Sequence, residues 1–326
     1  MGSIDKDYRQ VLYTDDWEEE EKTQILTWRD SVLESDFAES VPVVMCGLAS
    51  ITMAVTFALF YATGMTTEKV CEIAKLGHCG KIDDWQFIPT ISFTFVDWPG
   101  YGVSLFGMLT SAVLLWVSSE LEYHILETQM RRLNVRPNQR ITGWCCCCCT
   151  LSCAVGFARL VGHVICISFA VCMICQLRFN VYVHAMAAVI LFVGGLIMIL
   201  AHQQIQCTLL DTATTRQDDQ EISQNWAADA ASAMRFKRYA LLFYVACGLA
   251  YGIALQFRRT EVEPYSAATE YAVVISLAVG VASYAMDIRM HKKYFSSGSS
   301  RLAIVDDYRG SHDRLASDMT GWTMED

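Results

Sequence analysis

Long apolar stretches are the feature that most constrains this sequence. Each runs for about 20 residues, and a helix of that length crosses a hydrocarbon core of about 30 Å. In lipid, a segment must pair its own backbone N–H and C=O groups, which a helix does. The stretches cover residues 42–64, 101–119, 151–176, 181–202, 239–256 and 267–287. The sequence therefore predicts an all-α fold, a six-helix transmembrane bundle.

Composition supports this interpretation and excludes two other classes. Hydrophobic residues make up 53% of the chain and charged residues only 18%, whereas about 25% of the residues in a soluble domain are charged. The formal net charge is −10, and nucleic-acid binding requires a basic surface. We therefore exclude an ordinary soluble enzyme and expect no nucleic-acid partner.

Basic residues near the ends of the spans predict the orientation, because cytoplasmic loops carry an excess of Lys and Arg. They gather after the second span, before the fifth and after the sixth: Arg131, Arg132, Arg136, Arg140, Arg216, Arg235, Lys237, Arg238, Arg289, Lys292 and Lys293. This pattern predicts that both termini are cytosolic and that the loop from Met65 to Trp98 is luminal or extracellular.

The membrane domain, residues 42–293, lies between two polar tails. Residues 1–41 form an acidic tail, and residues 294–326 are rich in Ser and Asp and typical of disorder. We expect both tails to be cytosolic and to recruit cytosolic proteins. Between residues 16 and 40, Trp28, Val32 and Leu33 recur at helical spacing. This spacing predicts an amphipathic helix that docks on the bundle or on a partner.

The 14 cysteines fall into three settings. Cys71 and Cys79 lie in the predicted luminal loop, where the oxidising environment allows a disulfide to form. Two free thiols are the alternative. Most of the others lie within spans. The run Cys145, Cys146, Cys147, Cys148 and Cys149 follows a basic loop at the cytosolic start of the third span. Adjacent cysteines cannot surround a metal tetrahedrally, so we interpret the run as a palmitoylation site or as apolar filling of an interfacial turn.

Ionisable residues inside spans are the usual places to look for function. Arg159 and His163 are four residues apart and share one helix face, while His184 and Glu270 lie near the luminal ends of their spans. Together these residues are candidates for a lipid-headgroup or proton-sensitive site. The alternative is structural hydrogen bonding between helices.

Small residues mark places where helix backbones can approach closely. One stripe is Ala154, Ala158 and Gly162, and another is Gly248 and Gly252. No phosphate-binding loop, metalloprotease motif or nucleophile elbow is present. We therefore expect no catalytic residue, cofactor or metal site.

Three short motifs resemble the DRAM-type family. That family groups damage-regulated autophagy modulators with SFK-like regulators of phosphoinositide kinase and CWH/FRAG-type proteins of GPI-anchor lipid remodelling. The matching residues are Pro89, Ile91 and Ser92 before the second span, His184, Phe192 and Gly195 in the fourth, and Glu270 at the start of the last.

The resemblance implies a non-enzymatic regulator or scaffold of endomembranes that acts on autophagy and lysosome function or on membrane lipid organisation. Its expected partners are membrane lipids, and its expected location is the endolysosomal or plasma membrane. Two alternatives stay open. One is a transporter or channel for a small solute. The other is a GPI-anchor lipid-remodelling factor, for which Ser92, His184 and Glu270 are the candidate reactive residues. The oligomeric state stays open as well.

Overall fold

A computed structural model describes residues 28–74, 89–133, 135–141, 150–176, 179–215, 221–256 and 263–295. Within these ranges the protein is helical and has no named strand, which confirms the predicted all-α fold. The helices are α3 (Trp28–Glu34), α4 (Ser40–Ala62), α5 (Thr67–Ala74), α6 (Ile91–Thr94), α7 (Gly100–Arg132), α8 (Leu151–Ile174), α9 (Val181–Thr215), α10 (Glu221–Gln256), α11 (Glu263–Ala282) and α12 (Tyr284–Phe295).

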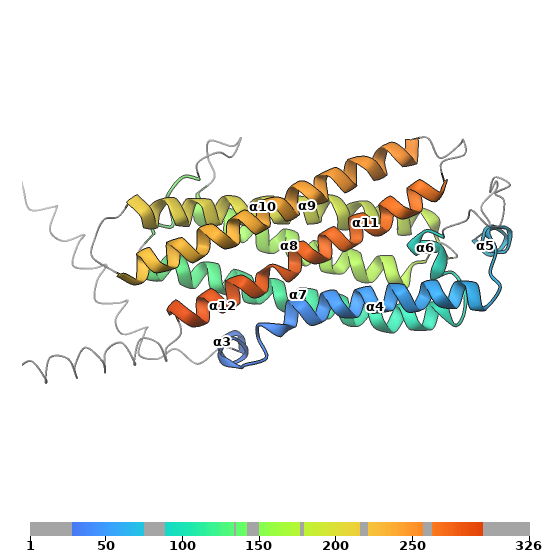
Figure 1. Cartoon of the computed structure of the whole chain (residues 1–326), viewed down its shortest axis with the longest axis horizontal. Coiled ribbons are helices and arrows are strands. Elements are labelled where there is room, and N and C mark those ends of the chain that lie inside the picture. The colour runs from blue at the N-terminus through green and yellow to red at the C-terminus, as the bar shows by residue number, and fades with distance from the viewer. Residues whose placement is uncertain are drawn as a thin grey trace, which may run out of the picture.

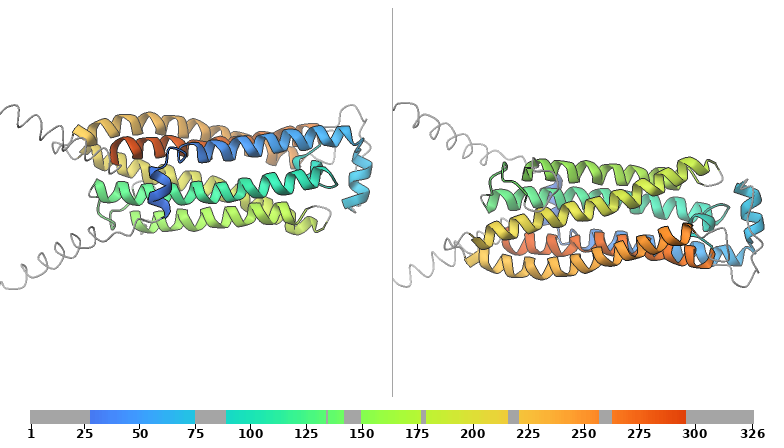
Figure 2. Two further views of the ribbon diagram at one scale, coloured as in Figure 1. Left: turned by 90° about the horizontal axis from the view of Figure 1, so that it is seen from below. Right: turned by 90° about the horizontal axis from the view of Figure 1, so that it is seen from above.

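The long helices lie side by side as one bundle (Figure 1). α8 packs on α7 and α9, α10 packs on α9 and α11, and α4 closes the bundle against α7 and α11. The short helices α5 and α6 lie at one end, and α3 and α12 lie toward the other (Figures 1 and 2). We refer to these as the α5–α6 end and the α3–α12 end.

Five stretches of the described chain are long and apolar enough to cross a membrane: 40–62, 100–132, 151–174, 181–215 and 267–295. The remaining predicted span, the fifth (239–256), lies in α10, which packs in the same bundle. α7, α9 and α10 have 33, 35 and 36 residues, more than the roughly 20 that a hydrocarbon core requires. They therefore continue beyond the predicted spans at the α3–α12 end.

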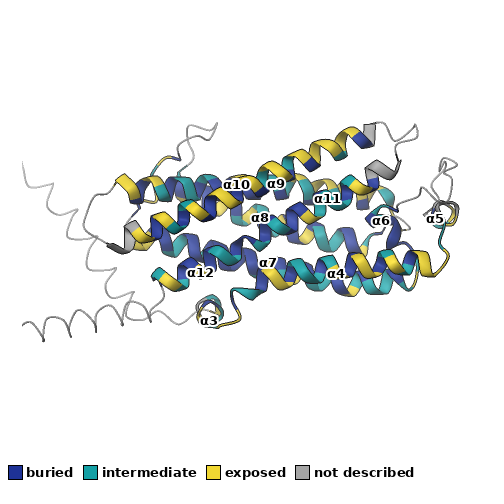
Figure 3. Ribbon diagram, viewed as in Figure 1, coloured by how far each residue is buried: buried dark blue, intermediate teal, exposed yellow. Residues whose placement is uncertain are grey.

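Many large apolar residues are exposed on the bundle, whose exposed positions are yellow in Figure 3. Phe106, Ile167 and Leu249 are each more than 60% exposed. Exposed apolar area on this scale is unusual for a protein surrounded by water. Such a surface suits contact with lipid. The exposed apolar side chains and the long apolar helices therefore both indicate a multi-pass membrane protein.

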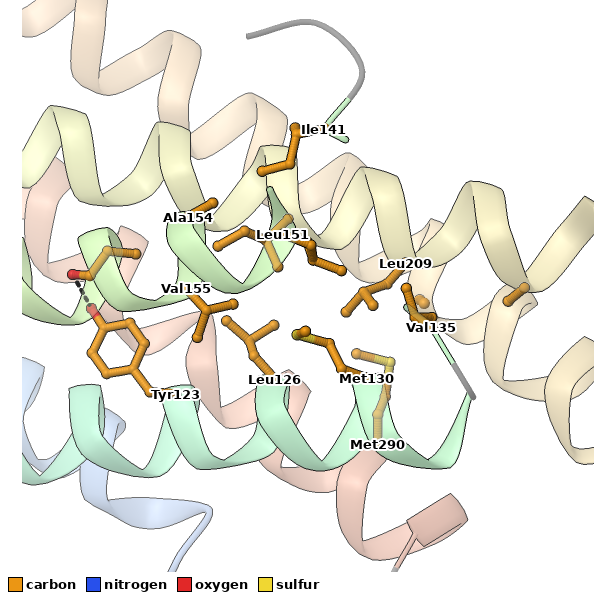
Figure 4. Packing of buried hydrophobic residues seen from close by; sticks show 14 of the residues in the cluster. Tyr123, Leu126, Met130, Val135, Ile141, Leu151, Ala154, Val155, Leu209 and Met290 are labelled. Carbon is orange, nitrogen blue, oxygen red and sulfur yellow. Dashed lines mark hydrogen bonds between the residues drawn. The ribbon is translucent and has the colours of Figure 1, made fainter. Parts of the chain in front are cut away.

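The α3–α12 end has its own packed core (Figure 4). Leu126, Leu151, Leu209 and Met290 join α7, α8, α9 and α12 there. Tyr123 fills the space between α7 and α8, and its hydroxyl donates to the carbonyl oxygen of Ala158 at 2.8 Å, the dashed line in Figure 4.

The two small-residue stripes have different surroundings. A Cβ on Gly162 would lie 2.7 Å from Tyr123 Oη, so the stripe on α8 serves the predicted close approach to α7. A Cβ on Gly248 or Gly252 would meet nothing within 4 Å in the described structure. The prediction of close backbone contact at that second stripe is therefore wrong within the bundle, because this face of α10 points outward.

Replacing Gly162 with Val should destabilise the bundle by about 1–3 kcal/mol, the usual cost of overpacking. Tyr123 cannot move away easily, since its ring stacks on His202 at 5.2 Å and its side chain is buried. Gly156→Val is the matched control, because it makes the same change on α8 where a Cβ meets nothing within 4 Å. Thermal unfolding in detergent measures both variants. Equal destabilisation would contradict the packing role of Gly162.

Candidate functional site

Three residues singled out in the sequence come together at the α5–α6 end: His184 and Glu270 from their positions in the spans, and Ser92 from the family motif. Ser92 lies in α6, His184 in the first turn of α9 and Glu270 in α11. Ser92 Oγ is 2.9 Å from His184 Nε2 and 3.5 Å from Glu270 Oε1. His184 and Glu270 are buried, and Ser92 is partly buried. We call these three residues the serine cluster.

The hydrogen bonds of His184 determine its tautomer. Its Nδ1 lies 3.0 Å from the carbonyl oxygen of Cys172 and 3.2 Å from that of Cys175. Carbonyl oxygens only accept, so Nδ1 carries a proton, and Nε2 of the neutral ring is an acceptor. Ser92 therefore donates its hydroxyl proton to His184. The longer contact with Glu270 is secondary, because a hydroxyl has only one proton to give.

An apolar cavity of about 80 Å³ adjoins the serine cluster. It lies between α4, α7, α8, α9 and α11, and its lining extends along α11 from Glu270 to Val281, about 16 Å of helix. Ser92 and Glu270 are the oxygen-bearing side chains among its lining residues. The other lining residues include four flexible thioether side chains: Met45, Met53, Met108 and Met173.

A second polar group lies inside the bundle toward the α3–α12 end. Lys237 of α10 forms an ion pair with Asp287 of α12 and donates to Gln206 Oε1 of α9 at 2.9 Å. Gln206 Nε2 donates to Asp287 Oδ1 at 3.0 Å, and Glu122 Oε1 of α7 lies 3.4 Å from the same nitrogen. Lys237, Asp287 and Glu122 are at most 4% exposed. This set, the lysine network, ties four helices together.

The other two predicted polar residues, Arg159 and His163, lie apart from both the serine cluster and the lysine network. Arg159 and His163 do share a helix face, as predicted, and both contact Glu120 of α7. They therefore do not join His184 and Glu270 around one cavity, the arrangement that a continuous polar path through the bundle would need.

Other residues of the family motifs have structural contacts. Phe192 offers its carbonyl oxygen to the hydroxyl of Tyr244 at 2.7 Å. A Cβ on Gly195 would lie 2.8 Å from Leu277, so this glycine lets α9 approach α11. Pro89 and Ile91 are buried beside Ser92 in the chain.

Two predicted cysteine sites fall outside the described structure. Cys79 lies outside it, as do Cys145, Cys146, Cys147, Cys148 and Cys149; for Cys71 only the backbone is described. The disulfide and the palmitoylation site therefore stay predictions. In the ranges that are described, no group of three or more His, Cys, Asp or Glu residues could hold a metal ion.

The charged residues of the lysine network were missed by sequence reasoning. Glu122 comes just after the predicted end of the second span, and Asp287 ends the sixth, so both resembled boundary residues. Lys237 counted only as one of several basic residues that set the orientation. One feature of the sequence could have revealed the network. Lys237, Glu122 and Asp287 lie on three different helices at the same predicted membrane boundary, so their side chains could meet.

Comparison with known protein families gives one match. A family model described as Frag1/DRAM/Sfk1/Cwh43P N-terminal domain matches residues 38–291, which include the serine cluster and the lysine network. No curated protein and no solved structure matched the chain.

Neutralising one member of the buried Lys237–Asp287 pair should destabilise the protein by about 3–5 kcal/mol, because the other charge is left buried and unpaired. Lys237→Met and Asp287→Leu should each show this loss, and the double variant should recover most of it. Asp229→Asn is the control, since it breaks the exposed pair of Asp229 with Lys293 and should change little. Unfolding measured in detergent tests the series. Additive losses in the double variant would contradict the pairing.

Proposed function

The chain belongs to the Frag1/DRAM/Sfk1/Cwh43P family, and we propose that it is a non-enzymatic, lipid-binding regulator of membranes. In this proposal the bundle holds the apolar chain of a membrane lipid in its cavity. The polar part of that lipid lies at the serine cluster. The observation that carries the proposal is the cavity itself, an apolar space inside a membrane bundle that ends on two oxygen-bearing side chains.

The lining chemistry supports an apolar chain as the ligand. A ligand pocket is mostly apolar with a few placed polar groups that fix the orientation, and here those groups are Ser92 and Glu270 at one end. Four methionines are among the other lining residues, and methionine adapts its shape to irregular partners. The cavity is narrow, so an entering chain would displace these flexible side chains.

The wider role follows from the family and from the tails. We propose that lipid occupancy in the bundle is coupled to cytosolic proteins recruited by residues 1–41 and 294–326. Such a scaffold would act on autophagy and lysosome function or on membrane lipid organisation, in the endolysosomal or plasma membrane. The expected orientation, with both tails cytosolic, comes from the basic residues at the α3–α12 end.

Filling the cavity should prevent lipid binding. Ala188 lines the cavity, and Ala188→Phe should lower crosslinking to a phosphatidylcholine with a diazirine at the end of one acyl chain by about tenfold, which corresponds to about 1.4 kcal/mol of binding free energy. Ala185→Phe is the matched control, three residues earlier on α9 and exposed. The readout is mass spectrometry of the purified full-length protein in nanodiscs. Equal crosslinking of wild type and Ala188→Phe would contradict the proposal.

A second candidate function is acyl transfer from a lipid, as in GPI-anchor lipid remodelling. The contact between Ser92 Oγ and His184 Nε2 favours it, because a serine beside a neutral histidine is the usual nucleophile and base. Ser92 Oγ would attack an ester carbonyl of the lipid and pass its proton to His184. That proton would then go to the departing alcohol, leaving an acyl ester on Ser92 for transfer to water or to another alcohol.

A serine-reactive fluorophosphonate separates the two functions. If Ser92 is a nucleophile, the probe should label wild-type protein, and Ser92→Ala should lose the label but still crosslink to the diazirine lipid. Ser118→Ala is the control for general reactivity, since that hydroxyl is bonded to the carbonyl oxygen of Leu114 on its own helix. Absence of labelling on the folded wild-type protein would remove the acyl-transfer candidate and leave the binding proposal unaffected.

A further inference from the structure

A cluster of basic side chains surrounds Glu120 on the outside of the bundle, away from the cavity and the lysine network. Arg159 of α8 donates from Nε and Nη2 to the two oxygens of Glu120, at 2.9 Å each. Arg29 of α3 forms an ion pair with the same carboxylate. His163 Nε2 lies 3.2 Å from Glu120 Oε1. We call Arg29, Glu120, Arg159 and His163 the arginine cluster.

The hydrogen bonds of the arginine cluster fix its net charge. Trp116 Nε1 lies 3.2 Å from His163 Nδ1, and an indole nitrogen can only donate. His163 Nδ1 is therefore an acceptor, and Nε2 carries the single ring proton that faces Glu120. The ring is neutral, so two guanidinium groups face one carboxylate. The cluster carries one uncompensated positive charge.

That charge is accessible from outside the protein, while the carboxylate is not. The side chains of Arg29 and Arg159 are 23% and 35% exposed, and that of Glu120 is 2% exposed. Arg159 donates to Glu120 from Nε and Nη2, and no described residue hydrogen bonds to its Nη1. Arg159 therefore has N–H donors available for a further anion, and the partly exposed Arg29 adds a second positive charge beside it.

The arginine cluster lies at the level of a membrane boundary. From Gly100 to Glu120, α7 rises about 30 Å, the thickness of a hydrocarbon core. Trp28 and Trp116 stack beside the cluster with ring centroids 5.8 Å apart, and tryptophan is enriched at membrane–water interfaces. Val113 on α7 and Leu160 on α8 are 59% and 60% exposed. Acyl chains can lie against this apolar surface while a headgroup reaches the arginines.

We propose that Arg29 and Arg159 bind the phosphate of an anionic phospholipid in the leaflet at the α3–α12 end. Arg is the side chain best suited to phosphate, because its planar donors match the oxygens in pairs. One net negative charge on the lipid compensates the one excess positive charge of the cluster. The basic residues at this end favour the cytosolic leaflet, which is rich in anionic lipids.

Lipid binding at this site would also hold α3 on the bundle. Arg29 is the residue of α3 that reaches Glu120, and Leu33 of α3 packs on Leu121, Ile125 and Ile288. A bound phosphate would neutralise the repulsion between Arg29 and Arg159 and so strengthen this docking. The α3 segment thus reports whether the site is occupied.

The experiment compares the full-length protein in nanodiscs of phosphatidylcholine with and without phosphatidylglycerol, two lipids that share a phosphodiester but differ in net charge. Hydrogen exchange of residues 28–34 should slow with phosphatidylglycerol, and native mass spectrometry should detect retained phosphatidylglycerol. Arg159→Gln should reduce that retention by about tenfold. Arg29→Gln should also reduce phosphatidylglycerol retention. Arg29 lies in α3, outside the long helices, so this substitution should leave the bundle folded.

Controls separate this proposal from others. Arg132→Gln removes an exposed positive charge from the same end of α7 and should change nothing. Ala188→Phe should leave phosphatidylglycerol retention intact even if the cavity proposal is correct. Retention by Arg159→Gln equal to wild type would overturn the proposal. If inorganic phosphate added to phosphatidylcholine nanodiscs slows exchange as much as phosphatidylglycerol does, the ligand is a soluble anion and the lipid assignment is wrong.

Discussion

The lysine network is the interaction on which the helix arrangement depends. Lys237, Asp287 and Glu122 come from three helices and are almost completely buried, and Gln206 of a fourth helix bonds to all three. A buried charge is costly unless it is paired and hydrogen bonded. Apolar contacts between helices in lipid are weakly specific, since lipid tails are as apolar as leucine. The network therefore selects which helices meet and in which register.

The polar groups divide the bundle into layers with different properties. The serine cluster lies toward the α5–α6 end, the lysine network lies toward the α3–α12 end, and the cavity extends from the first of these into the bundle. The lysine network is enclosed within the bundle and links four helices, which suits a structural role. The serine cluster is partly open to an apolar space, and the arginine cluster is open to the outside. Binding is therefore expected at the two incompletely enclosed sites.

The sequence predicted the helices well because the length of an apolar stretch is a local property. It also identified His184 and Glu270, since polar residues in spans are rare, and Ser92 through the family motif before the second span. It could not predict that the pairs Ser92–His184 and Ser92–Glu270, separated by 92 and 178 residues, form one cluster while His163 contacts Glu120. The sequence also could not predict that Gly248 and Gly252 face outward, because a small-residue motif does not show whether another helix packs against it.

The order of the chain gives the lysine network a consequence for biosynthesis. Lys237 is made 50 residues before its carboxylate partner Asp287, and a charge buried in the protein is costly until it is paired. Until α12 has been synthesised, the nascent protein holds Lys237 without its ion-pair partner, and Glu122 of α7, linked to it through Gln206, is the carboxylate of the network already made. A chain that stops before α12 therefore lacks the carboxylate that completes the buried ion pair, so assembly of this end of the bundle has to wait for the last helix.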